Sequence, residues 1–447
     1  MRQVPVFSRS LVCATLALSL SACGGAREPE SESEAAAATD SGPSPSTGPT
    51  YHADIRPLLE GRCVGCHSEK GSAPMRLDGY EDAAYWATPI RTMVTTRQMP
   101  PWTAGGDCND YVADPTLSDE QIALVAEWVD DGAPEGDPKD ARPALTVPDL
   151  PFRADRLLTM AESYTPQVTP DEYRCFLLPW PDTTAGYLRG VGLVPGNPKM
   201  VHHSVLSLVP PRLAQAFLDR DAADPGPGYT CWTGTGPQGA ELIGAIEKVE
   251  AGWVFPAGVG LRVEPGSYVL MQQHYNTLAT GAAEPDRSSI EVMVEPTAVD
   301  GSTHWLVNVN WPLGEMRIPA GQSGVTFRHE ADATAVVGAG ASLHWADLHM
   351  HVLGTRGSLT RVRADGSEEC LLRVDDWKFA WQQTFRFARP IELAPGDRLA
   401  LECEYDNTAA NQYSPSGPAP APRDVNWGDR STDEMCLGNF LVTNAAP

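Results

Sequence analysis

From Phe152 onward, glycine and proline break the sequence into short runs that predict strands rather than helices. The whole chain of 447 residues contains 40 Gly and 40 Pro, and helical patterns are few after its first third. Short strands at regular spacing are typical of β-sandwiches and jelly rolls. Because roughly 300 residues exceed one small sandwich, we expect a mainly β fold with two jelly-roll β-sandwich domains in tandem, residues 152–300 and 301–447. The clearest predicted strands are Leu188–Val194, Ser204–Val209, Tyr268–Tyr275, Ser289–Val294, Trp305–Val309 and Leu399–Glu404.

The N-terminus predicts export. The apolar run from Leu11 to Leu20 is too short to remain in a bilayer as a helix, and arginines flank its start. The four residues Leu-Ser-Ala-Cys that end at Cys23 resemble a bacterial lipobox, with Cys23 as the lipid-modified residue; an ordinary cleaved signal with a chance cysteine is the alternative. We expect residues 1–22 to be a lipoprotein signal peptide. The mature protein would then lie in the periplasm or at the outer membrane, held to the membrane by its lipid anchor only.

Residues 23–50 predict a disordered linker, because alternating glutamates, an alanine run and Ser, Pro, Gly and Thr cannot bury enough apolar surface to fold. A second, shorter linker is expected near Pro143–Pro151. The net charge of −25 argues against a nucleic-acid partner, since nucleic-acid binding needs a basic surface.

A C-x-x-C-H motif, Cys63 to His67, follows the first linker. This spacing is that of c-type haem attachment, in which both thiols bond to the haem and the histidine supplies an axial nitrogen. A disulfide between Cys63 and Cys66 or a zinc half-site are the alternatives, although zinc would need two more ligands and only Cys108 is at hand. For the second axial ligand we expect Met99 in Met-Pro-Pro-Trp, with Met75 as the alternative.

Helical patterns flank this motif. Ile55, Leu58 and Leu59 have helical spacing before it. Ser118 and Gln121 form a capping box that predicts a helix over Ile122–Val129, with Gly132 to end it. Residues 51–142 therefore resemble a small all-α cytochrome c-like domain that carries haem c.

The motif His349-x-His351 lies in a strand-like stretch of the last third. Alternate side chains on a strand point to the same face, so both imidazoles can reach one metal ion. The thioether of Met435, from a distant strand, would complete a site that suits copper, especially Cu(I), and leaves a position open for dioxygen. Two surface histidines and a core methionine are the alternative.

A second set of candidate ligands is His202, His203 and His274. Adjacent side chains on a regular strand point to opposite faces, so His202 and His203 can share a metal ion only if their strand bends. The chain has 10 histidines, however. The two sets of candidate metal ligands contain five of them, and the histidine of the C-x-x-C-H motif is a sixth.

Four motifs occur in the order found in the copper type II, ascorbate-dependent monooxygenases, which include peptidylglycine α-hydroxylating monooxygenase and dopamine β-hydroxylase. The resemblance covers roughly Asp171 to Val442 and rests on Val201-His202-His203, Gln272-x-His274, His349-x-His351 and Glu434-Met435-Cys436. It implies two tandem jelly rolls with one copper ion each.

In that resemblance, His202, His203 and His274 match the copper site that transfers electrons. The site that binds dioxygen and hydroxylates a C–H bond is matched by His349, His351 and Met435. Gln272 matches a glutamine between the two sites.

The resemblance also implies two disulfides, Cys175–Cys231 and Cys403–Cys436, in a compartment that permits them. Cys108 and Cys370 are left without assigned partners.

The substrate residues depart from the peptide-amidating members. Where those enzymes have an arginine, an asparagine and a tyrosine, this chain has Asp347, Leu437 and Asn439. Most of a carboxylate clamp is thereby lost, which argues against peptide amidation. Asp347 could receive an amine instead, or it could be a structural carboxylate.

We therefore expect a copper-dependent monooxygenase that hydroxylates a C–H bond of a small organic substrate with dioxygen. The fused haem c, itself reduced by an external donor, would deliver electrons and replace or supplement ascorbate. The alternative is a non-catalytic haem and copper protein of the cell envelope that relays electrons or handles copper. A cell-surface binding module that has lost its metals is a third reading.

Overall fold

The computed structural model gives a mainly β protein with several small sheets. The residues that it describes belong to one compact unit, Thr47–Pro447. In this part of the chain no helix is long and apolar enough to cross a membrane. The predicted signal peptide, the lipidation site Cys23 and most of the first linker lie outside the described residues, which are 48–69, 73, 75–145, 152–231, 239–247, 252–277, 282–379, 381–414 and 418–444.

A helical region comes first. The predicted capping box at Ser118 and Gln121 is present and opens α4, and Gly132 follows the helix end with a positive φ of 83°. Ile55, Leu58 and Trp128 are buried in the shared core of this region. Its helices are η1 (Tyr51–Ile55), α1 (Arg56–Arg62), α2 (Tyr80–Tyr85), α3 (Ala87–Thr95), α4 (Asp119–Asp130) and η2 (Pro138–Asp140).

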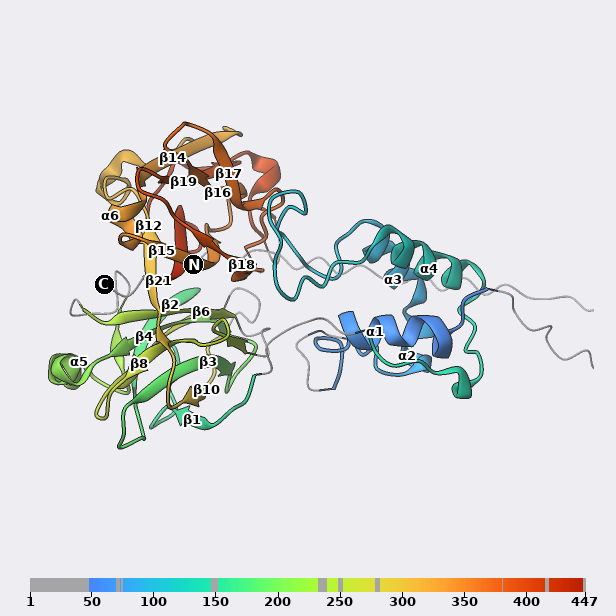
Figure 1. Ribbon diagram of the computed structural model, residues 1–447, viewed down its shortest axis with the longest axis horizontal. Helices are drawn as coiled ribbons and strands as arrows, with labels where there is room; N and C mark the ends of the chain where they lie inside the picture. Colours follow the sequence, from blue (N-terminus) through green and yellow to red (C-terminus); the bar gives the residue numbers. More distant parts are fainter. Residues whose placement is uncertain are drawn as a thin grey trace, which may run out of the picture. The chain divides into compact units, whose positions relative to one another are not determined.

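The first β region contains two sheets, of strand order β5-β2-β9-β4-β6 and β1-β10-β3-β8-β11, with β7 paired to β3. Figure 1 labels β2, β4 and β6 of the first sheet and β1, β3, β8 and β10 of the second. Apolar side chains from both sheets, such as Met271 and Ile290, fill one core. Its elements are β1 (Arg156–Thr159), β2 (Asp171–Pro179), β3 (Gly186–Val194), β4 (Val201–Val209), α5 (Pro211–Ala223), β5 (Tyr229–Thr230), β6 (Glu241–Glu247), β7 (Trp253–Val254), β8 (Val259–Val263), β9 (Tyr268–Asn276), β10 (Ser289–Glu295) and β11 (Val299–Asp300).

The second β region repeats this plan with the sheets β12-β21-β15-β18 and β14-β19-β16-β17, and β13 pairs with β20 (Figure 1). Phe440 and Leu401, one from each sheet, are fully buried in its core. Its elements are β12 (Ser302–Leu306), η3 (Trp311–Glu315), β13 (Arg317–Ile318), β14 (Val325–Asp332), α6 (Ala333–Val337), β15 (Ala341–His349), β16 (Gly354–Val362), β17 (Glu368–Val374), β18 (Phe385–Glu392), β19 (Arg398–Tyr405), η4 (Ala409–Asn411), β20 (Val425–Asn426) and β21 (Leu437–Asn444).

Five of the six strands predicted above are present, and the sixth is misplaced. Instead of Trp305–Val309, the strand β12 runs from Ser302 to Leu306 and pairs with β21 over that length. Beyond it, Asn308 accepts a bond from the Asn310 amide in a turn, and Val309 is 73% exposed. The apolar character of this run therefore continues past the strand into a surface turn. The domain boundaries expected from sequence stay predictions.

Three disulfides join six of the eight described cysteines. Cys175–Cys231 and Cys403–Cys436 are both formed. Cys108 and Cys370, which the sequence left unassigned, are bonded to each other across 262 residues of chain. Cys63 and Cys66 stay unbridged, so the disulfide alternative for the C-x-x-C-H motif is wrong.

Candidate functional site

His202, His203 and His274 come together on the neighbouring strands β4 and β9. One ligand atom from each ring can be chosen so that all three lie within 4.8 Å of one another, and among the described residues this is the one such group of His, Cys, Asp or Glu. The register between β4 and β9 shifts between Val201 and His203, so His202 sits at a bulge. Because a bulge re-aims a side chain, adjacent histidines can share one face. The two Nδ1 atoms of His202 and His203 approach to 2.9 Å.

A buried carboxylate fixes the orientation of His274. Its Nε2–H donates to Asp171 Oδ1 at 2.9 Å, and its Nδ1 is buried and makes no hydrogen bond. Tyr173 stacks on the ring with centroids 4.2 Å apart. A carboxylate that holds one imidazole nitrogen commonly leaves the other as a metal ligand. His274 is therefore oriented to offer Nδ1 to a metal ion in this group.

Burial keeps the ring of His203 neutral. It lowers the pKa of His203 well below the ordinary value of 6.5, and the neighbouring rings His274 and His202 lower it further. Only a neutral imidazole has a lone pair to give to a metal, so His203 can ligate at neutral pH without first losing a proton.

His349 is the last residue of β15, and His351 is the second residue beyond the strand. Their ring centroids lie 5.1 Å apart, while Met350 between them is fully buried in the core, as strand alternation predicts. His349 Nδ1–H donates to Gln382 Oε1 at 2.7 Å, and His351 Nδ1–H donates to the Asp433 carbonyl at 3.2 Å. Both contacts leave Nε2 as the nitrogen that could ligate.

The segment that carries Met435 is held by the carboxylate of Glu434. Glu434 accepts the backbone N–H groups of His351 at 2.8 Å and Leu353 at 2.6 Å. The Cys403–Cys436 bridge fixes the next residue, and Tyr405 OH donates to the Met435 carbonyl at 2.6 Å. Main-chain contacts thus place Met435 beside the His349 and His351 pair, and all three line one cavity.

That cavity has a volume of about 630 Å³ and is lined from both β regions. The first region contributes His203 and Gln272, and the second contributes His349, His351 and Met435. The rings of His203 and His349 lie 6.5 Å apart between centroids. Both histidine groups therefore border the same space, with Gln272 in its wall.

Several residues that carry hydrogen-bond acceptors line this cavity. Asp347 is partly buried and accepts from Asn439 Nδ2 at 3.1 Å, and desolvation raises its pKa to about 7. Asn439 Oδ1 and one oxygen of Asp429 are buried without a hydrogen-bond partner, and both residues also line the cavity. Unpaired buried acceptors are costly, so this part of the wall favours a ligand that donates hydrogen bonds.

The C-x-x-C-H motif follows α1 in the helical region. His67 is buried and its Nδ1–H donates to the Met75 carbonyl at 3.1 Å, which leaves Nε2 as the nitrogen for an axial bond. Met99 is 39% exposed. Within the described residues, no group of three His, Cys, Asp or Glu includes Cys63 or Cys66, so the zinc alternative gains no support. Two free thiols and an oriented histidine fit covalent haem attachment.

Sequence reasoning missed four contacts of the histidine groups. Asp171 and Tyr173 lie in a stretch noted only for its cysteine, although strand alternation places them on one face with Cys175. Gln382 and Phe379 lie in the connection between β17 and β18, where no motif marked them. Phe379 stacks on His202 with centroids 4.9 Å apart. Only the folded chain brings these side chains to the site.

Residues 310–442 match the family model described as "Copper type II ascorbate-dependent monooxygenase, C-terminal domain". A curated protein of Drosophila melanogaster, "MOXD1 homolog 2", is 23% identical over 192 residues, which cover 39% of this chain and 25% of that protein. The chain thus matches about a quarter of the length of this relative.

Solved structures give faint likenesses only. The VP2 subviral particle of infectious bursal disease virus has a TM-score of 0.16 at 13% identity, covering 65% of this chain and 71% of that one. "Crystal Structure of the STIV MCP" has a TM-score of 0.22 at 9% identity, covering 63% of this chain and 96% of that one. No conclusion follows from these. The family model over the second β region, together with the insect relative, supports the copper type II monooxygenase family.

Proposed function

We propose that this chain is a copper-dependent monooxygenase that hydroxylates a C–H bond of a small organic substrate with dioxygen. The observation that carries the proposal is the cavity of about 630 Å³ bordered by both histidine groups and Met435. A cavity of this size is in the range of small-molecule sites. The alternative, a non-catalytic relay or copper-handling protein, would have no need of such a space beside its ligands.

The ligand set is consistent with two copper ions. His202, His203 and His274 would hold one, and His349, His351 and Met435 would hold the other, since imidazole with a thioether suits copper. Bound copper would supply the one-electron chemistry that dioxygen requires. In the overall reaction the substrate C–H becomes C–OH, the second oxygen atom leaves as water, and two electrons and two protons are consumed.

The protein side chains would orient these ligands and shape the cavity. Asp171 holds His274 by its Nε2–H, and Gln382 holds His349 by its Nδ1–H. Glu434 fixes the main chain at His351. Rigid second contacts of this kind keep ligands in place and raise metal affinity.

We further propose that the substrate is an amine with an apolar body. Asp347, Asn439 and Asp429 present acceptors to the cavity, while Trp305 and Trp427 lie in its wall. An ammonium group could satisfy the unpaired acceptors, and the aromatic rings could cover apolar or cationic parts.

We also propose that the helical region is a cytochrome c-like domain whose haem c is held by Cys63, Cys66 and His67, with Met99 opposite. Met75 is the weaker choice, because its main chain already contacts His67. Bound haem would supply single electrons, in place of ascorbate or beside it. The jelly-roll topology of both β regions, the expected domain boundaries and the exported lipoprotein state belong to the same proposal.

Metal content is the first test. The exported protein with its haem maturation intact should contain two copper ions and one iron per chain. Met435→Ala should lose copper at one site, because it removes one of three ligands there, and should keep its iron. Copper and iron are measured by mass spectrometry beside the optical spectrum of haem. One iron per chain with no tightly held copper would refute the proposed monooxygenase function and would indicate a haem protein.

A substrate screen tests the amine. Pairs of equal shape, an amine and its neutral hydrocarbon or alcohol counterpart, are compared by oxygen uptake and product analysis. We expect the amine to be favoured by roughly 10-fold or more in kcat/KM, and Asp347→Asn to reduce that preference, because a carboxylate contributes more than a neutral amide to a charged hydrogen bond. Equal rates for both members of each pair would rule out the amine but not the hydroxylation.

A further inference from the structure

Residues 102–112, here called the strap, leave the helical region and run along the second β region. Gly105 N–H donates to the Arg373 carbonyl on β17 at 2.7 Å. Farther along, the Ala388 N–H on β18 donates to the Asp110 carbonyl at 2.9 Å. Strands β17 and β18 are the end strands of two different sheets. The strap therefore ties the edges of both sheets together.

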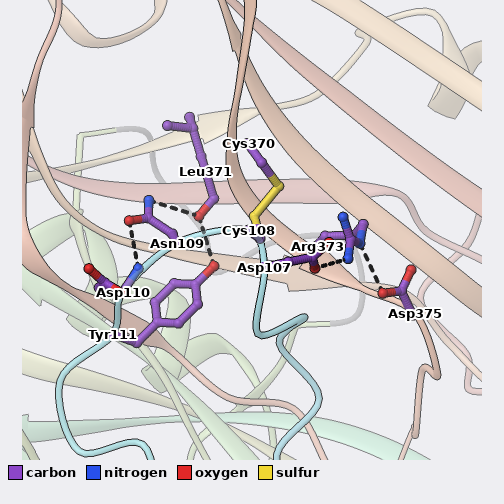
Figure 2. Close-up of a disulfide and its surroundings, with 9 residues drawn as sticks. All are labelled: Asp107, Cys108, Asn109, Asp110, Tyr111, Cys370, Leu371, Arg373 and Asp375. Atoms are coloured by element: carbon purple, nitrogen blue, oxygen red, sulfur yellow. Dashed lines mark hydrogen bonds and ion pairs between the residues drawn. A yellow bond between two sulfur atoms is a disulfide. The ribbon is translucent and has the colours of Figure 1, made fainter.

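A disulfide and a tyrosine hydrogen bond fasten the strap to β17 (Figure 2). Cys108 is bonded to Cys370, and Tyr111 OH donates to the Leu371 carbonyl at 2.9 Å. Asp107 forms an ion pair with Arg373. On the side of β18, the ring of Trp102 packs against Phe385 with centroids 5.0 Å apart.

The connection between these two strands reaches both histidine groups. We call it the site loop, residues 375–379 and 381–384 of the described chain. Gln382 accepts from His349 Nδ1–H at 2.7 Å, and Trp377 Nε1–H donates to the His351 carbonyl at 3.0 Å. Phe379 stacks on His202 with an interplanar angle of 17°. The site loop thus contacts ligand candidates of both groups, and the strap holds its two ends.

We propose that the strap is a disulfide-locked device that positions the site loop, and that Cys108 and Cys370 are positioning residues for His349. The proposal rests on the proposed function only in that His349 would be a copper ligand. With the lock closed, both ends of the site loop are fixed and Gln382 stays in reach of His349 Nδ1. With the lock open, the loop gains freedom and that hydrogen bond is lost part of the time.

This disulfide is also the one among the three that a reductant can reach most easily. Cys108 and Cys370 are partly exposed, whereas Cys175, Cys231, Cys403 and Cys436 are each 0–1% exposed. A small dithiol would break the Cys108–Cys370 bond, leave two cysteine thiols and become a cyclic disulfide itself. The lock can therefore be opened in the folded protein without touching the buried bridges.

The test uses the full chain without added copper, so that its outcome does not depend on copper chemistry. Hydrogen exchange of the site loop and the ¹⁵N signals of the His349 ring are followed in wild type, in wild type treated with a dithiol, and in the double variant C108S/C370S. Opening the lock should speed exchange of site-loop amides by roughly 10-fold or more, while the strands of the first β region stay protected. The His349 ring should lose its fixed Nδ1–H tautomer, since Gln382 no longer holds it.

Two further variants separate positioning from general stability. Gln382→Ala should give the same altered His349 ring signal as opening the lock does. The strap amides should stay protected from hydrogen exchange in this variant. Asp107→Asn, which removes an exposed ion pair but keeps the disulfide, should leave the exchange and the ring signal as in wild type. The proposal is overturned if opening the lock leaves the site loop and the His349 signal unchanged, or if protection falls evenly over the whole second β region. Copper content, measured separately, reports on the proposed function alone.

Discussion

At the scale of single residues, Asp171 connects the two histidine groups. Its Oδ1 accepts from His274 at 2.9 Å, from Asn276 at 2.7 Å and from Ser431 at 3.0 Å. Ser431 belongs to the second β region and lies four positions before Met435. One carboxylate thus orients a ligand candidate of the first group and anchors the segment that carries a ligand candidate of the second. An anionic acceptor allows this, because it can take several donors at once.

Replacing this carboxylate should weaken copper binding at one group in particular. In Asp171→Asn the amide can donate to His274 Nε2, which favours the tautomer with its proton on Nδ1 and blocks the nitrogen that faces the group. We expect copper affinity at His202, His203 and His274 to fall by roughly 10- to 100-fold. Competition with a copper chelator measures the affinity, and the ¹⁵N signals of His274 in the metal-free protein report the tautomer.

The matched control is Ser431→Ala. It removes one donor to Asp171 and leaves the bond to His274 in place. The His274 tautomer should therefore stay, and copper affinity at His202, His203 and His274 should change by no more than about 3-fold. If Asp171→Asn kept both the tautomer and the affinity, the orienting role of the carboxylate would be refuted.

At the scale of elements, strand periodicity predicted the His349 and His351 pair but not the arrangement of His202 and His203. Alternation alone is enough for His349-x-His351, with Met350 turned into the core. The adjacent residues His202 and His203 can share one face because of the bulge where β4 pairs with β9. A register shift depends on how two distant strands pair, and one strand's sequence does not contain it.

The site loop and the strap were beyond sequence reasoning for a related reason. Gln382 and Phe379 carry no local pattern, and only the return of the chain from β17 to β18 brings them to the histidines. Cys108 and Cys370 were recognised as unassigned cysteines, but their pairing spans 262 residues. Connectivity of disulfides cannot be deduced from spacing alone. The capping box at Ser118, by contrast, was predictable because all its contacts are local.

At the scale of the whole molecule, the two β regions share part of one core. Trp345 on β15 is 1% exposed and packs against residues of the first region. Its ring centroid lies 4.7 Å from that of Trp253 and 5.2 Å from that of Phe255. The same strand ends at His349. Packing between the regions and the geometry of the cavity therefore depend on one strand.

We accordingly expect Trp345→Ala to destabilise both β regions and not the second alone. Truncating a buried tryptophan leaves a cavity and should lower the free energy of unfolding by about 3–5 kcal/mol, measured by denaturant titration. Because the ring fills a core shared with Trp253 and Phe255, hydrogen exchange should rise in β8 of the first region as well as in β15. Trp305→Ala is the control, since Trp305 is 42% exposed and should cost far less. If hydrogen exchange in Trp345→Ala rose in the second β region only, the two regions would unfold independently. That result would contradict a coupling of the two regions through the shared core.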